Sequence, residues 1–98
     1  MKYNFDYSLE KDSVLRETRG IGFEEIIDAI ESGNILGNIK HPNKNKYPNQ
    51  WMFVIKIKEY VYLVPYVVDD ERKVLFLKTF YPNRKATRQY LKNEQKER

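Results

Sequence analysis

The sequence predicts a single α+β domain in which two N-terminal helices pack on a small, mainly antiparallel sheet and a C-terminal helix follows. Three observations support this prediction: residues 23–31 repeat apolar side chains with the period of a helix, residues 51–81 alternate them with the period of a strand, and Pro82-Asn83 separates the last strand from another helical stretch. With 98 residues, 41% of them apolar and 14% aromatic, the chain can build one modest core. We therefore expect one domain over residues 1–98.

The N-terminal third is predicted to hold a strand and two helices. Residues 2–7 alternate aromatic and polar side chains, which is typical of a half-buried strand. Ser8 can cap a first helix that runs to about Arg19. In the second helix, Gly33 fits the C-terminal cap, and four apolar side chains fall on one face: Phe23, Ile26, Ile27 and Ile30.

After Gly33 the pattern predicts strands at residues 34–39, 51–58, 60–68 and 74–81, the last two joined by a polar turn at residues 69–72. Pro65 cannot donate a ladder hydrogen bond, so we expect its strand to lie at an edge of the sheet or to be bulged there. Asn83 can cap a final helix over residues 84–93. The polar tail, residues 94–98, is expected to fray.

Charge is divided unevenly along the chain. Residues 1–36 carry four bases and eight acids, whereas residues 37–98 carry 14 bases and six acids. This asymmetry favours an anionic partner for the second part, with nucleic acid as the first candidate. The absence of cysteine and the single histidine exclude disulfides, thiol nucleophiles and multi-histidine metal sites. No long apolar run is present, so we expect a soluble, cytoplasmic protein without a membrane span. We also expect no metal or cofactor, because the acids of the second helix lie outside its apolar stripe, where solvated acids belong, and no glycine-rich phosphate motif is present.

The start of the last helix is the clearest candidate for an anion site. Arg84, Lys85 and Arg88 fall in its first turns, where the helix dipole favours acids. A bound phosphate would explain this placement, since backbone N–H groups and cationic side chains would converge on it. Arg84 and Arg88 are four residues apart and could clamp one phosphodiester. The alternative is a solvated basic face.

Two further residues could move protons or hold charge. Lys78 lies between Phe76 and Phe80 on one face of the predicted strand. It is either a solvated lysine or a fixed cation at the surface of the sheet. His41 is the side chain whose ordinary pKa suits proton transfer near neutrality. It stands in a lysine-rich loop with Lys46, although His-Pro-Asn is also an ordinary turn composition. The Trp51 and tyrosine side chains of the strands could stack on bases or pack in the core.

Three short segments resemble BrnT-like toxins. Residues 19–26, Arg-Gly-Ile-Gly-Phe-Glu-Glu-Ile, resemble that family's Lys-His-Gly-Val/Ile-x-Phe-Glu-Glu-Ala, with Arg19 where the family has histidine. Residues 84–90 resemble its closing Arg-Lys/Arg-Ala-Thr followed by tyrosine, and Phe5-Asp6 suits its opening. The loop over residues 41–50 has no counterpart in these motifs.

The resemblance implies a RelE-like fold and the toxin of a type II toxin–antitoxin pair, a ribonuclease that arrests translation. It also implies a DNA-binding antitoxin, for example of the ribbon-helix-helix type, through which alone the toxin would reach operator DNA. We expect a metal-independent attack of the RNA 2′-hydroxyl on the adjacent phosphate. The expected roles are phosphorane stabilisation by Arg84 and Arg88, proton transfer by Lys78 or His41, orientation by Tyr81 or Tyr90, and backbone contacts by Lys85, Lys46 and Lys56.

Two other hypotheses use the same features. One is a non-catalytic module that binds RNA or protein through the basic surface. The other is head-to-tail self-association of the acidic second helix with the basic half of the chain.

Overall fold

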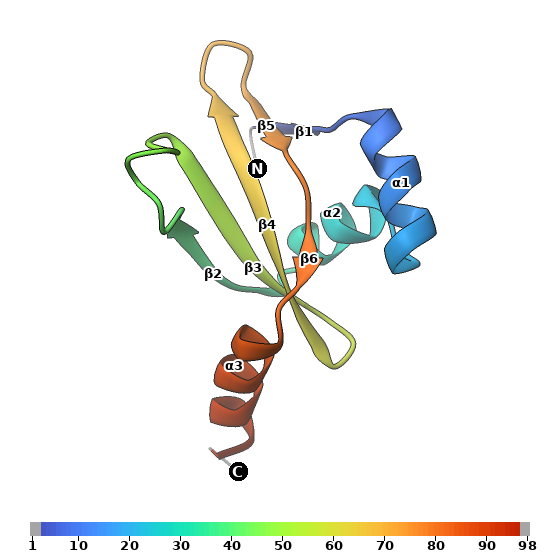
Figure 1. Ribbon diagram of the computed structural model, residues 1–98, viewed down its shortest axis with the longest axis vertical. Coiled ribbons are helices and arrows are strands. Elements are labelled where there is room, and N and C mark those ends of the chain that lie inside the picture. Colours follow the sequence, from blue (N-terminus) through green and yellow to red (C-terminus); the bar gives the residue numbers. More distant parts are fainter. Residues whose placement is uncertain (1–2, 97–98) are drawn as a thin grey trace.

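The computed structural model describes residues 3–96, with side chains described for residues 3–91. The elements follow in the order β1 (Asn4–Asp6), α1 (Leu9–Arg19), α2 (Phe23–Glu31), β2 (Ile35–Lys40), β3 (Gln50–Ile57), β4 (Tyr60–Asp69), β5 (Val74–Leu77), β6 (Tyr81–Pro82) and α3 (Arg84–Lys96). The sheet runs β1-β5-β4-β3-β2, and β6 pairs with β4 beside β5. Among the strands of residues 3–96 only β1 and β5 pair in parallel, so the predicted α+β fold with a mainly antiparallel sheet is confirmed (Figure 1).

The two N-terminal helices have the predicted bounds. The C-cap residue of α2 is Ser32, and Gly33 follows it with φ 83°, the left-handed conformation common just past a helix end. The Ser8 hydroxyl accepts a hydrogen bond from the Lys11 N–H at 3.1 Å and begins α1. Gly22 precedes α2 at a point where a Cβ atom would lie 2.6 Å from side-chain atoms of Arg16 and Asp12. The Asp12 carboxylate accepts a hydrogen bond of 2.7 Å from the Phe23 N–H, which joins α1 to the first turn of α2.

α1 and α2 lie on one face of the sheet, and α3 lies on the other. Phe53 and Ile55 of β3 point to α1 and α2, where they pack with the apolar stripe of α2 in the main core. Val54, between them, points to the other face and packs with Val61 and with Ala86 of α3. The period of two predicted for residues 51–58 thus sorts the side chains of β3 between two cores. The face on which α3 packs is called the α3 face below.

Pro65 does not lie at an edge, because β4 is a central strand that pairs with β3 over residues 60–67. The irregularity expected there is on the other side of β4, where the register shifts by one residue between the pairs Leu63–Tyr81 and Tyr66–Leu77. The Pro65 carbonyl accepts a hydrogen bond of 2.8 Å from the Lys78 N–H. In an antiparallel strand the N–H and C=O of one residue point to the same neighbour. The proline nitrogen, which has no hydrogen to donate, therefore faces residues 78–80, the interruption between β5 and β6. No described strand offers a ladder acceptor to Pro65 at this point.

The strand predicted over residues 74–81 is divided by this interruption, residues 78–80. Leu75 and Leu77 alternate into the main core as expected, but Phe80, three residues after Leu77, is also fully buried there. The irregular segment thus shifts the alternation by one residue. Phe76 and Phe80 consequently point to opposite sides of the sheet, which corrects the prediction that they share a face with Lys78.

The C-terminal helix begins at the predicted residue and extends to Lys96, three residues beyond its predicted end. The last two residues of the tail expected to fray, Glu97 and Arg98, lie outside the described residues. Within the described part of the chain, the helices lack the combination of length and apolar character needed to cross a bilayer.

Candidate nucleic-acid interface

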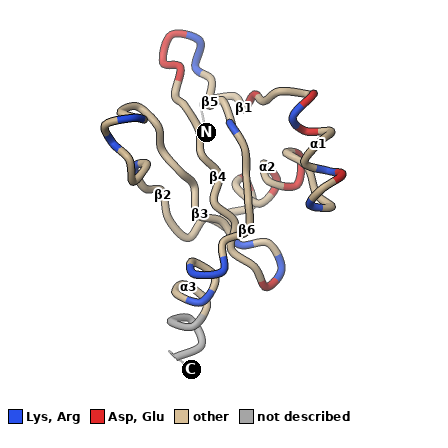
Figure 2. Tube along the Cα trace, viewed as in Figure 1, with Lys and Arg blue, Asp and Glu red and all other residues tan. Residues whose placement is uncertain are grey.

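The uneven charge of the sequence is arranged in space by the two faces of the sheet. Residues 9–31, which form α1, α2 and their connection, carry seven acids and three bases. Residues 84–91 of α3, on the other face, carry three bases and no acid. Figure 2 shows red segments on α1 and α2 and blue segments at the start of α3. This distribution favours contact of an anionic polymer with the start of α3 over contact with α1 and α2.

The start of α3 is held on the sheet by hydrogen bonds to a single residue of β4, Val61. The Asn83 N–H donates to the Val61 carbonyl at 3.0 Å, and the Val61 N–H donates to the Thr87 hydroxyl at 2.9 Å. Asn83 also caps the helix as predicted, since its side-chain oxygen accepts from the Ala86 N–H at 2.8 Å. These bonds fix both the position and the rotation of the first turn.

This rotation turns the bases of α3 to solvent. Ala86 is buried against Val54 and Val61, whereas Arg84, Lys85 and Arg88 are exposed. The first turn contains no acid. Among residues 3–91 both ion pairs are made by Arg16, so none involves these three bases. Arg84, Lys85 and Arg88 form the basic cluster at the start of α3, which is thus open to an external anion. The same arrangement also fits the alternative interpretation, a solvated basic face.

Tyr81 and Lys78 lie on the same face of the sheet as this cluster. Tyr81 is directly opposite Leu63, whose side chain packs against Val54, Val61 and Ala86. Lys78 is exposed and lines a groove on the α3 face beside Phe76. Its N–H bonds to Pro65, four residues along β4 from Val61, where α3 begins. Four strand residues span about 13 Å, so Lys78 and the α3 bases can contact the same phosphate only with their long side chains extended toward each other.

Tyr90 and Lys56 also belong to the α3 face. Tyr90 is half-buried and packs against Val54. Its hydroxyl lies 3.3 Å from the position that a Cβ atom would take on Gly37 of β2. Lys56 is directly opposite Val61, and its side chain points to the same side of the sheet. Tyr90 therefore helps to pack α3 against the sheet.

His41 and Lys46 are not brought to this cluster. The His41 N–H donates to the Gln50 carbonyl at 2.9 Å, so His41 lies where β3 begins, whereas Lys56 and α3 lie where β3 ends. The intervening part of β3 spans about 20 Å. In the loop between β2 and β3, the His41 ring lies 4.4 Å from the Tyr47 ring, and the Lys46 ammonium lies over that ring at 5.4 Å.

The strand aromatics are divided between core and surface. Tyr66 is buried and stacks on Phe53 at 4.2 Å. Burial raises the pKa of its hydroxyl, although its hydrogen bond to Asn38 acts in the opposite direction. Trp51 and Tyr62 are half-buried against the main core, and Tyr60 is exposed. The core interpretation therefore holds for Tyr66, and these side chains do not form one stacking surface.

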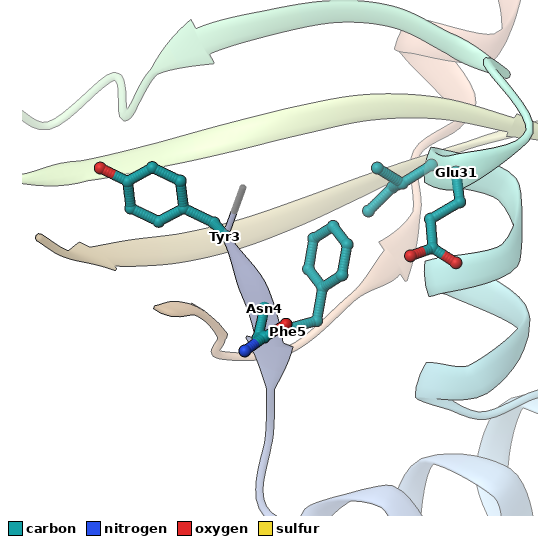
Figure 3. Close-up of a pocket in the computed structure, with 5 residues that line it drawn as sticks. Tyr3, Asn4, Phe5 and Glu31 are labelled. Carbon is teal, nitrogen blue, oxygen red and sulfur yellow. The ribbon is translucent and has the colours of Figure 1, made fainter. Parts of the chain in front are cut away.

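The acidic face offers different chemistry. A cavity of about 480 Å³ lies between β1 and the end of α2, and Phe5 and Glu31 flank it (Figure 3).

At the start of α2, the Gly22 N–H donates to Glu25 at 2.9 Å, and Arg16 lies 3.3 Å from the same carboxylate. The backbone hydrogen bond and the nearby guanidinium hold the pKa of Glu25 below its usual range. Glu25 is therefore engaged in joining α1 to α2.

The comparisons with known proteins return little. No family model matches the chain, and no curated protein matches it. Among solved structures, the chain is similar to an arginine-to-alanine double mutant of the E. coli toxin RelE in the free state. The two share 22% sequence identity with a TM-score of 0.47, over 95% of this chain and 98% of that one. A similarity at this level assigns neither an activity nor a partner, and the BrnT-like resemblance stays a prediction.

Proposed function

We propose that this protein is the toxin of a type II toxin–antitoxin pair, an endoribonuclease that cleaves RNA on the α3 face and so inhibits translation. The observation that carries the proposal is the basic cluster at the start of α3, exposed and without an ion pair among residues 3–91, on the sheet face that also bears Lys78 and Tyr81. A helix selected for stability alone would carry acids in its first turn.

The reaction proposed is the attack of an RNA 2′-hydroxyl on its own 3′-phosphate. The hydroxyl loses its proton, its oxygen bonds to phosphorus, and the 5′-oxygen of the next nucleotide leaves and takes up a proton. The products are a 2′,3′-cyclic phosphate and a free 5′-hydroxyl. Because the nucleophile belongs to the substrate, the protein has to stabilise a dianionic phosphorane and move two protons.

The residues of the α3 face suit these tasks. Arg84 and Arg88 present planar donors that can hold phosphorane oxygens, and Lys85 and Lys56 would contact the adjacent backbone. Lys78 would transfer protons, and Tyr81 would orient the scissile group. Tyr90 would orient the substrate only in addition to its packing role, and His41 is too distant to act on the same phosphate. Lys46, in the β2–β3 loop, would contact only a distant part of the strand.

The antitoxin is proposed from the short motifs alone. A ribbon-helix-helix-type DNA-binding protein would neutralise the toxin and carry it to operator DNA in the cytoplasm. An adjacent reading frame that encodes such a protein would support this part of the proposal.

The cleavage test compares two charge-matched double variants. Purified wild-type protein is incubated with a long RNA in EDTA, and the products are resolved on a denaturing gel. We expect cleavage by the wild type and by Lys11→Ala/Arg19→Ala, which removes two bases from α1 on the opposite face. Arg84→Ala/Arg88→Ala should lose at least about 100-fold in rate, the scale for removal of transition-state charge stabilisation. Undiminished cleavage by a folded Arg84→Ala/Arg88→Ala variant would overturn the assignment.

A non-catalytic RNA-binding module is the second candidate, favoured by the solvent-facing orientation of the α3 bases. It predicts binding without product formation. Its affinity would fall steeply with salt because bound phosphates release counterions. Electrophoretic mobility shifts at two salt concentrations, run beside the cleavage assay, distinguish the two candidates.

A further inference from the structure

A groove of about 300 Å³ lies on the part of the α3 face beyond Lys78. Apolar side chains of β4 and β5 line it together with Lys78 and Arg72 and with two acids, Asp6 and Asp69. It lies outside the residues assigned to the chemistry above, except that Lys78 stands at its border.

Strand register builds this groove from three separate parts of the chain. Phe76 of β5 is directly opposite Val67 of β4 and pairs on its other side with Asp6 of β1. Directly opposite residues point to the same face of a sheet. Asp6, Phe76 and Val67 therefore form one row across the sheet, and Asp69 lies opposite Val74 in the next row. Phe76 is only half-buried, so part of its ring is open to a ligand in the groove.

We propose that this groove binds a nucleobase of the RNA, next to the phosphate held at Lys78 and α3, with preference for bases that carry an amino group. The proposal rests on the proposed function, since it names a substrate feature for the same face. A half-exposed aromatic ring beside aliphatic side chains offers a stacking surface that any base can use. The four charged side chains that line the groove sum to zero, which suits a neutral planar ring better than a phosphate.

The acids give the groove a preference among bases. Asp6 accepts a hydrogen bond from the Tyr7 N–H at 2.8 Å, and Asp69 accepts one from the Arg72 N–H at 3.1 Å. These bonds hold each carboxylate through its Oδ1, and the other oxygen can accept from a ligand. Carboxylates pair with the amino groups of cytosine, adenine and guanine. Uracil has two carbonyl oxygens and a single N–H, so it faces the acids with fewer donors.

Lys78 connects the groove to the basic cluster. Its exposed ammonium lies at the end of the groove nearer to β6, and the chain continues through Tyr81 to Arg84. A strand whose base occupies the groove would pass Lys78 before reaching the α3 bases. The groove would then set which base lies beside the cleaved bond.

Binding and cleavage are tested separately. ¹⁵N-labelled full-length protein is titrated with 2′-O-methyl tetranucleotides, which cannot be cleaved by 2′-hydroxyl attack: one of adenosine, guanosine and cytidine, and one of uridine only. We expect the amino-bearing strand to shift the amide signals of Val67, Val74 and Phe76, and to bind at least about fivefold more tightly than oligouridine. Equal affinity for the two strands, or shifts confined to α3, would overturn the groove proposal.

The variants separate this proposal from the cleavage activity. Phe76→Leu keeps an apolar side chain but removes the stacking ring, and Asp6→Asn keeps an oxygen for the Tyr7 N–H but removes the charge. Phe76→Leu should weaken the binding of both tetranucleotides, Asp6→Asn should lose the preference for amino-bearing bases, and both variants should still cleave RNA. Val68→Leu, on the neighbouring residue that points to the other face, should keep the preference. Unchanged binding by Phe76→Leu together with a persistent preference in Asp6→Asn would contradict the proposal while leaving the ribonuclease assignment intact.

A protein side chain is the competing occupant. If N-acetyl-arginine amide shifts the groove signals and the tetranucleotides do not, the groove belongs to a protein partner and the nucleobase proposal is wrong. If the wild-type protein does not cleave RNA, the proposed function is wrong, whatever the groove signals show.

Discussion

Thr87 of α3 and Val61 of β4 share a hydrogen bond in which the Val61 backbone N–H donates to the Thr87 hydroxyl at 2.9 Å. The same hydroxyl donates to the Asn83 carbonyl at 2.8 Å. The Thr87 hydroxyl therefore accepts from the backbone N–H of Val61, near the start of β4, and donates to the backbone carbonyl of the helix cap Asn83. It holds the basic cluster at a fixed place on the sheet.

Removal of this hydroxyl should destabilise the protein. Thr87→Val keeps the shape of the side chain but leaves the Val61 N–H without its acceptor, and we expect the free energy of unfolding to fall by about 1–3 kcal/mol. Urea denaturation followed by circular dichroism measures this change. Thr87→Ser retains the hydroxyl and is the matched control. Equal stability of Thr87→Val and the wild type would show that the bond contributes nothing to holding α3.

A second contact between α3 and the sheet sets a steric limit at Gly37. A Cβ atom there would lie 3.3 Å from the Tyr90 hydroxyl and 3.6 Å from Val54. Gly37→Ala should therefore press on Tyr90, and Tyr90→Phe, which removes the hydroxyl, should relieve the pressure. We expect a favourable coupling of about 0.5 kcal/mol between the two substitutions, the lower end for residues in contact. A double-mutant cycle by urea denaturation measures it, and additive effects would contradict the close approach.

Local patterns predicted the elements whose reasons are local. The stripe from Phe23 to Ile30 and the caps at Ser8 and Asn83 are set by residues within one or two turns, and the structure has them where they were predicted. The position of Pro65 depended on something else, the interruption of a partner strand at residues 78–80. A proline in a central strand is tolerated where its missing donor faces such an interruption.

The candidate site divides in the same way. The phase of α3 could be predicted from its own sequence, since Ala86 and Tyr90 fall on one helical side and Arg84 and Arg88 on another. The separation of His41 from that helix could not, because it depends on the direction of the β2–β3 hairpin. The groove around Phe76 gave no signal in the sequence, since its row joins β1, β5 and β4 through non-local register.

Glu25 makes the stability of the α1–α2 corner depend on pH. Its pKa in the folded protein is lowered, so the charged form stabilises the fold above the unfolded pKa of about 4.3, and this contribution is lost as the pH falls through the folded value. Glu25→Gln should therefore be less stable than the wild type at pH 7, with the difference shrinking below pH 4. Thermal unfolding at pH 7 and pH 3 measures it. Glu24→Gln, in the same helical turn but without the Gly22 and Arg16 contacts, should show a smaller pH-dependent difference, and an equal one would assign the effect to the helix dipole.

His41 separates two interpretations of the chemistry. If it were the general base for the phosphate at α3, its removal would cost about 100-fold to 10,000-fold in rate. It lies at the other end of β3, where its Nδ1 accepts a hydrogen bond from the Asn43 N–H at 3.1 Å and its ring contacts Tyr47. We therefore expect His41→Ala to keep its cleavage rate within about tenfold of the wild type in the EDTA assay, below the range for loss of a general base. Lys78→Ala, assayed at the same RNA concentration, should fall further because its ammonium lies on the α3 face. A larger loss in His41→Ala than in Lys78→Ala, with both variants folded, would move the reacting phosphate to the β2–β3 loop.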